Sequence, residues 1–176
     1  FRRNKGTISG LLTLLDILLE AKEMKREILI ILYDLSAAFD TVPHQILIEK
    51  LRLYGFSQLS LEWMKSYLSN RKQFVEVSGK RSREQEMSIG TPQGSRLSPL
   101  LFIILMADLD LWTENSNLSN FADDTQSIIV SDDRKNLLET AAIQANSVIS
   151  FFNSNGLVNN ADKAAVLYNS KGKSED

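Results

Sequence analysis

The chain has 176 residues, of which 43% are hydrophobic and 24% are charged, a composition typical of one globular domain or one domain with a small lobe. It has no cysteine and a single histidine, His44, which excludes disulfides, thiolate zinc sites, iron–sulfur clusters and multi-histidine metal sites. A metal ion would therefore be held by oxygen ligands, which indicates magnesium or manganese. The apolar runs are too short to span a bilayer.

The net charge of −2 is unevenly distributed along the chain. Residues 65–96 carry seven basic and three acidic side chains, whereas residues 97–176 carry five basic and eleven acidic ones. A basic middle beside an acidic end fits a protein with a track for a polyanion and a separate site for a cation. The alternative is a solvated hairpin with ordinary surface lysines.

The first part of the chain predicts a helix and then a buried strand. Leucines recur at helical spacing over residues 11–19, and the polar residues 20–23 follow. Residues 28–33 form a continuous apolar run that is typical of a central strand buried on both faces. This run ends in Asp34, and a carboxylate at the end of a buried strand is costly unless it is paired or bound to a metal. A functional role for Asp34 is at least as well supported as an exposed strand end.

The middle of the chain predicts two helices, a basic hairpin and a shaped loop. Pro43 suits the start of a helix that runs to Gly55, and a second helix covers residues 60–68. Alternation over residues 73–77, a turn at residues 78–80 and a return over residues 83–89 predict the hairpin. Two glycines and two prolines in residues 90–99 exclude regular structure, and such a loop before an apolar helix at residues 100–111 could contact a phosphate or nucleotide.

Two adjacent acids, Asp123 and Asp124, follow a short extended segment at residues 117–121. A second extended run at residues 127–130 predicts a β-hairpin with both acids at its tip. Crowded carboxylates repel each other, and a fold that holds them together usually binds a cation there. Taken alone, however, the tetrapeptide favours an acidic turn. A long helix to Asn155, a strand at residues 164–168 and a polar tail at residues 169–176 complete the chain.

If the hairpin lies beside the first strand, the carboxylates of Asp34, Asp123 and Asp124 converge. Converging oxygen ligands at one edge of a sheet fit a pair of divalent ions about 4 Å apart. A strand, a helical insertion, a hairpin and a further helix and strand predict an α+β fold, a small antiparallel sheet with helices on one face.

Three segments in this order carry a resemblance to a known family: DLSAAFD (residues 34–40), GTPQGS (residues 90–95) and FADD (residues 121–124). They resemble motifs A, B and C of reverse transcriptases, best those of non-LTR (LINE-type) retrotransposons. Residues 63–72 and 160–163 are similar to flanking segments of the family, so the resemblance covers nearly the whole chain. It implies a reverse-transcriptase palm with partial fingers over residues 1–176, with the thumb absent.

The resemblance also implies roles for individual residues. Asp34, Asp123 and Asp124 would ligate two magnesium ions, for which manganese can substitute, with help from the backbone carbonyl of Leu35. Phe39 would exclude a ribose 2′-hydroxyl, and Lys163 would protonate the leaving pyrophosphate; the alternatives are a core aromatic and a solvated lysine. The remaining candidates are the nucleotide-binding residues Gln93, Gly94, Arg3 and Lys5 and the nucleic-acid-binding residues Arg71, Lys72 and Arg96.

The implied function is an RNA-directed DNA polymerase core that adds deoxynucleotides to a primer 3′ end on an RNA template. Its expected partners are the RNA template, a DNA primer and deoxynucleoside triphosphates, without a membrane, inside a larger polyprotein with a thumb and an endonuclease. The resemblance implies an intracellular location, in the nucleus or the cytoplasm, and does not decide between the two. The alternative is a catalytically inert palm fragment that at most binds nucleic acid. A metal-dependent phosphohydrolase would explain neither Phe39 nor the loop at residues 90–99.

Overall fold

The computed structural model describes residues 7–113, 117–121 and 124–170. The chain divides into two compact units. The first unit combines the residues up to Leu35 with Leu109–Phe151 and the residues from Asn159 onward, and the second contains Ser36–Asp108 and Phe152–Val158. None of the described helices is long and apolar enough to cross a membrane.

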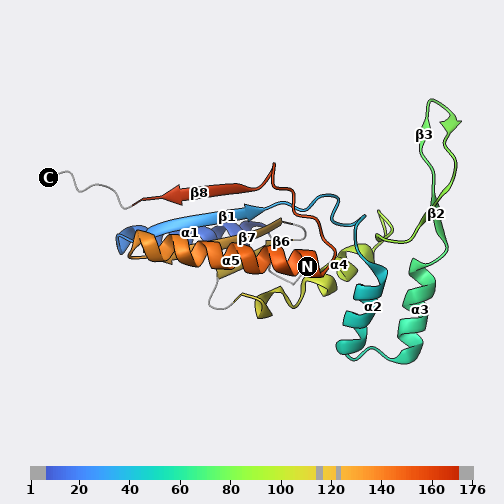
Figure 1. Cartoon of the computed structure of the whole chain (residues 1–176), viewed down its shortest axis with the longest axis horizontal. Helices are drawn as coiled ribbons and strands as arrows, with labels where there is room; N and C mark the ends of the chain where they lie inside the picture. Colours follow the sequence, from blue (N-terminus) through green and yellow to red (C-terminus); the bar gives the residue numbers. More distant parts are fainter. Residues whose placement is uncertain (1–6, 114–116, 122–123, 171–176) are drawn as a thin grey trace. The chain divides into compact units, whose positions relative to one another are not determined.

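The first unit is built on a four-stranded antiparallel sheet with the order β6-β7-β1-β8 (Figure 1). Its strands are β1 (Glu27–Tyr33), β6 (Asn117–Phe121), β7 (Asp124–Ser131) and β8 (Ala165–Asn169). The order along the chain, a strand, a helical segment, two strands, a helix and a strand, is that of the split βαβ arrangement. The predicted α+β class with an antiparallel sheet is therefore confirmed.

Both faces of the central strand β1 are buried, as its continuous apolar run predicts. Side chains alternate along a strand, so Ile28 and Ile30 share one face, where they form a cluster with Ile128 of β7 and Ala21 of helix α1 (Thr7–Glu23). Leu29, Ile31 and Tyr33 lie on the other face, and they are buried as well.

The long helix α5 (Arg134–Ser154) begins and ends where the sequence predicts. The Asp133 carboxylate accepts a hydrogen bond from the backbone N–H of Asn136 at 2.9 Å, which satisfies one of the free donors of the first turn. Leu137, Ala141 and Val148 are among its buried side chains and recur at helical spacing.

The structure differs from the expected elements after Met106, and it explains the polar residues of β6. The predicted helix at residues 100–111 is interrupted: α4 (Ser98–Met106) is followed by a separate 3₁₀ turn, Leu109–Leu111. Strand β6 contains the polar residues Ser119 and Asn120, which are unusual in a central strand. Because β6 lies at the end of the strand order, it pairs with β7 alone and tolerates this polarity.

The second unit contains helices α2 (His44–Leu53), α3 (Gln58–Leu68) and α4, and α2 packs against both of the others. Ser57 caps α3 by accepting a hydrogen bond from the backbone N–H of Ser60 at 3.3 Å. The side chains of these three helices that are almost completely buried include Leu47, Leu51, Leu68, Leu101, Phe102 and Leu105.

The predicted basic hairpin forms as two short ladders. Strand β2 (Arg71–Gln73) pairs with β5 (Gln85–Met87), and β3 (Glu76–Val77) pairs with β4 (Lys80–Arg81). Ser78 and Gly79 connect β3 to β4 with φ angles of 51° and 76°. Positive φ at both turn residues matches the right-handed twist of a two-residue hairpin.

A buried lysine connects α2 to the end of α4. Lys50 is 8% exposed, and its Nζ donates a hydrogen bond to the carbonyl of Leu105 at 2.6 Å and forms an ion pair with Asp108. The Leu105 carbonyl is one of the last four of α4, which have no partner within the helix, so a cation there is favourable. Burial lowers the pKa of Lys50, and the hydrogen bond to Asp108 opposes this effect.

We expect Lys50→Met to lower the free energy of unfolding by about 2 to 3 kcal/mol, because the Leu105 carbonyl and the Asp108 carboxylate lose their partner. Urea denaturation measures this change. Lys135→Met is a matched control, because Lys135 has a side chain 84% exposed and its Nζ lies 3.9 Å from Glu139 in an exposed pair. Equal stability of the two variants would show that the lysine does not stabilise this unit.

Candidate active site

Two of the predicted acids lie at the same end of neighbouring strands in the first unit. The register of β1 and β7 ends with Tyr33 opposite Thr125. Asp34 and Asp124 are the next residues outward along these two strands, so their backbones adjoin at one edge of the sheet. Asp124 is exposed, and the side chain of Asp34 is 34% exposed, so both carboxylates are accessible to a ligand.

Lys163 lies beside Asp34, although the two residues are far apart in the sequence. Its Nζ is 3.8 Å from Oδ2 of Asp34. The backbone holds this arrangement: the N–H of Asn160 donates to the carbonyl of Asp34 at 2.7 Å, and Leu35 forms a β-bridge with Asn159. The turn before β8 therefore brings the predicted proton donor to the predicted metal ligand.

The donor set at this edge fits a magnesium or manganese ion. Asp34 and Asp124 contribute carboxylate oxygens, which these ions prefer. Two buried side-chain oxygens next to this edge have no hydrogen-bond partner among the described residues. They are Oγ1 of Thr125, which follows Asp124, and Oδ1 of Asn159, which forms the β-bridge with Leu35. Within the same residues no three His, Asp or Glu side chains come together. Asp123, the third predicted ligand, lies outside the described part of the chain.

In the second unit, the loop at residues 90–94 is attached to the turn at residues 37–42. The N–H of Thr91 donates to the carbonyl of Phe39 at 2.8 Å, and the N–H of Gly90 donates to the carbonyl of Val42 at 2.8 Å. Nε2 of His44 lies 2.7 Å from the carbonyl oxygen of Gly90. Two of the segments that the sequence singles out are therefore held together by backbone hydrogen bonds.

Phe39 is half-buried, and its ring packs against Phe102 of α4. The ring centroids are 5.0 Å apart, with planes inclined by 40°, and Phe102 is 1% exposed. The alternative role for Phe39 is that of an ordinary core aromatic residue. That description fits Phe102 better, because Phe39 keeps part of its surface accessible.

Gln93 is oriented by an acid that the sequence analysis does not assign to the site. Its Nε2 lies 2.8 and 3.0 Å from the two carboxylate oxygens of Asp40. Both residues line a pocket of about 340 Å³, which Arg71 and Lys72 at the base of the hairpin also line. The structure thus gathers three predicted residues, Gln93, Arg71 and Lys72, around one polar pocket.

The other predicted residues are not part of this pocket. Gly94 and Arg96 are exposed and lie outside its lining. Arg3 and Lys5 fall outside the described residues.

Sequence reasoning assigns no role to Asp40, Thr91 or Phe102. Asp40 carries the one available signal, since it is the last acid of the DLSAAFD segment. Phe102 lies within an apolar run of seven residues, where no local pattern distinguishes it from its neighbours. Its role depends on a ring contact with a residue more than sixty positions earlier.

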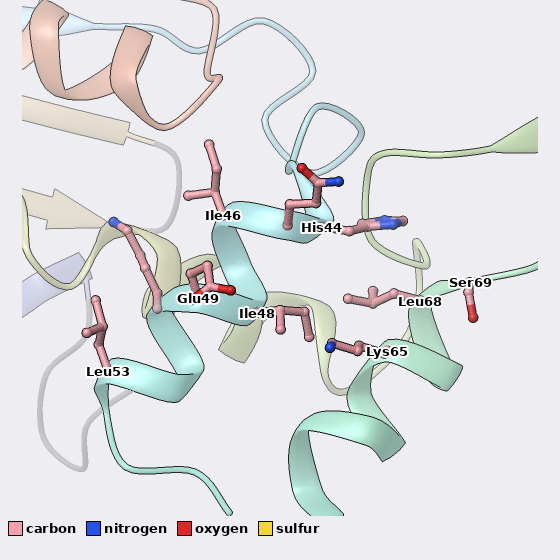
Figure 2. Close-up of a pocket in the computed structure, with 10 residues that line it drawn as sticks. His44, Ile46, Ile48, Glu49, Leu53, Lys65, Leu68 and Ser69 are labelled. Atoms are coloured by element: carbon pink, nitrogen blue, oxygen red, sulfur yellow. The ribbon is translucent and has the colours of Figure 1, made fainter. Parts of the chain in front are cut away.

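A larger and mostly apolar pocket of about 750 Å³ lies along α2 and α3. Ile48 of α2 and the Lys65 and Leu68 side chains of α3 lie across from each other there (Figure 2). It contains none of the predicted site residues, which lie at the acidic edge in the first unit and around the polar pocket in the second.

The antiparallel sheet with acids at one edge, and a shaped loop attached to the turn after the first acid, define an α+β palm of the polymerase class. The family model described as "Reverse transcriptase (RNA-dependent DNA polymerase)" matches residues 1–174. The chain belongs to the reverse transcriptase family, and the resemblance to its LINE-type members is confirmed.

Two relatives come from mobile elements of Drosophila melanogaster. The "RNA-directed DNA polymerase from mobile element jockey" is 33% identical over 132 residues, which are 71% of this chain and 14% of the relative. The "Probable RNA-directed DNA polymerase from transposon BS" is 35% identical over 109 residues, 62% of this chain and 12% of the relative. The chain thus spans about one seventh or less of the length of these relatives.

Among solved structures, the apo telomerase of Candida tropicalis truncated from its C-terminal domain has the same fold. It superimposes with a TM-score of 0.67 at 17% sequence identity, covering 94% of this chain and 35% of the telomerase chain. At this identity the likeness concerns the fold alone, and it supports the palm architecture.

Proposed function

We propose that this chain is the catalytic core of an RNA-directed DNA polymerase, which adds deoxynucleotides to the 3′ end of a primer on an RNA template. The observation that carries the proposal is the acidic edge of the sheet. Asp34 and Asp124 lie next to Tyr33 and Thr125, the last residue pair between β1 and β7, and Lys163 lies 3.8 Å from Asp34. This arrangement occurs in a chain that matches the family over residues 1–174.

In the proposed reaction the primer 3′-oxygen forms a bond to the α-phosphorus of the nucleotide, and the bond to pyrophosphate breaks. Asp34, Asp123 and Asp124 would hold two magnesium ions, with manganese as a substitute. Bound there, the ions would supply Lewis acidity for the attacking hydroxyl and positive charge for the leaving pyrophosphate. Lys163, whose side chain is 70% exposed beside Asp34, holds a proton for the leaving group.

The remaining residues bind and select the substrates. Phe39 excludes the 2′-hydroxyl of a ribonucleotide, and Gln93, held by Asp40, contacts the nucleotide together with Gly94. Nucleic-acid phosphates are bound by Arg71, Lys72 and Arg96. The triphosphate is contacted by Arg3 and Lys5, and a metal ion would be contacted by the backbone carbonyl of Leu35. Phosphate contacts by such cations hold the polyanion without reading its sequence.

The test is primer extension on a primed RNA template with deoxynucleotides and magnesium or manganese, beside the variant Asp123→Asn. We expect extension by the wild-type chain and none by the variant. Extension that survives the substitution would refute the role of Asp123. A wild-type chain that extends no primer with either metal ion would favour the second candidate, an inert palm fragment.

A further inference from the structure

Phe39, the residue proposed to select the sugar, is held at two points by its neighbours within the second unit. Its carbonyl accepts hydrogen bonds from Thr91, from the backbone N–H at 2.8 Å and from the hydroxyl at 3.3 Å. Its ring packs against Phe102 with a centroid distance of 5.0 Å. Thr91 holds the backbone of Phe39, and Phe102 limits where its ring can lie.

Phe102 is well suited to act as a fixed support. It is 1% exposed, and the next buried residues of α4, Leu101 and Leu105, are 1% and 0% exposed. The buried face of α4 cannot shift without creating voids, because protein interiors are close-packed. Phe39, in contrast, is half-buried. The pair therefore consists of one fully buried residue and one residue that keeps part of its surface accessible to a ligand.

We propose that Phe102 is a positioning residue for sugar selection: it holds the Phe39 ring where a ribonucleotide 2′-hydroxyl would collide with it. The proposal rests on the proposed polymerase function and extends it to a residue outside the three motif segments. Steric exclusion of one hydroxyl requires a wall that does not yield, since a small displacement of the ring would make room for one oxygen atom. Removing the support should therefore relax selection against ribonucleotides while leaving Phe39 itself in place.

The experiment compares kcat/KM for a deoxynucleotide and for the ribonucleotide with the same base, in single-nucleotide primer extension on an RNA template. The discrimination ratio is expected to fall about three- to tenfold in Phe102→Leu, an estimate from the contribution of an aromatic pair. The change should come from faster use of the ribonucleotide. Phe102→Met, which nearly preserves the buried volume, is the second variant if Phe102→Leu folds poorly.

Two controls separate positioning from a general loss of packing. Leu105→Val removes buried volume from the same helix, and it should affect both nucleotides equally and leave the ratio unchanged. Phe39→Val should lower the ratio by more than Phe102→Leu does. Because Phe102 acts through Phe39, the double variant Phe39→Val/Phe102→Leu should have the ratio of Phe39→Val alone.

The outcomes distinguish the two proposals. If the wild-type chain adds deoxynucleotides and the Phe102 variants keep the wild-type ratio, the inference is wrong and the polymerase function stands. The same conclusion holds if Leu105→Val lowers the ratio as much as Phe102→Leu. If the wild-type chain adds no deoxynucleotide, both proposals fall together.

Discussion

Asp34→Asn is expected to reduce primer extension about a thousandfold or more, because it removes a charged group that we propose as a metal ligand at the acidic edge. Asparagine keeps the size of the side chain and one oxygen, but it lacks the negative charge that balances a divalent ion. The fold should be unaffected. The contact that anchors this residue, the hydrogen bond from the N–H of Asn160, is made by its backbone carbonyl.

The measurement is the rate of deoxynucleotide addition under saturating substrate, together with urea denaturation of the same sample. Asp110→Asn is the matched control, since Asp110 is an exposed acid in the 3₁₀ turn, and it should change neither quantity. An Asp34→Asn variant that keeps more than about a tenth of the wild-type rate would exclude Asp34 as an essential metal ligand.

Gly90→Ala is expected to lower the free energy of unfolding by about 3 kcal/mol or more and to abolish nucleotide addition. Gly90 has a φ of +84°, and a Cβ placed there would lie 2.6 Å from the carbonyl oxygen of Asp40. That neighbour is backbone and cannot rotate away. The substitution would push the loop off the turn at residues 37–42 and break the hydrogen bonds that hold Phe39 and Gln93 in place.

Gly79→Ala provides the comparison for this prediction. Gly79 also has a positive φ, +76°, but no atom lies within 4 Å of the position of its Cβ. Only the cost of the left-handed conformation remains there, about 1 kcal/mol. Urea denaturation of the two variants isolates the contact with Asp40. Similar losses of stability in both would mean that the loop at residues 90–94 moves away from the turn at little cost.

The expected effect of a substitution depends on which of the two units contains the residue. The acidic edge, with Asp34, Asp124 and Lys163, belongs to the first unit, and the attached loop and turn, with Phe39 and Gln93, belong to the second. The chain passes from one to the other directly after Leu35. Variants of the first unit should therefore impair chemistry with both kinds of nucleotide, whereas variants at Phe102 should change the choice between them.

The elements themselves follow from local sequence. The apolar run at residues 28–33 predicts a strand buried on both faces, because every side chain of such a strand must be apolar, and β1 has this burial. The leucine spacing of α1, the capping Asp133 of α5 and the turn residues Ser78 and Gly79 likewise act within a few positions. Such signals predict the type of an element well and its ends less well, as the early end of α4 shows.

Sequence alone determined that this chain is an α+β protein of the reverse transcriptase family and that Asp34 and the acids at residues 123–124 are its candidate ligands. Only the tertiary structure decided which other residues contact the residues of the motif segments. Lys163 reaches Asp34, Asp40 orients Gln93, and Phe102 supports Phe39. The physical reason is that local conformation depends on near neighbours, whereas these contacts depend on strand register and helix packing, which bring together residues that the sequence keeps far apart.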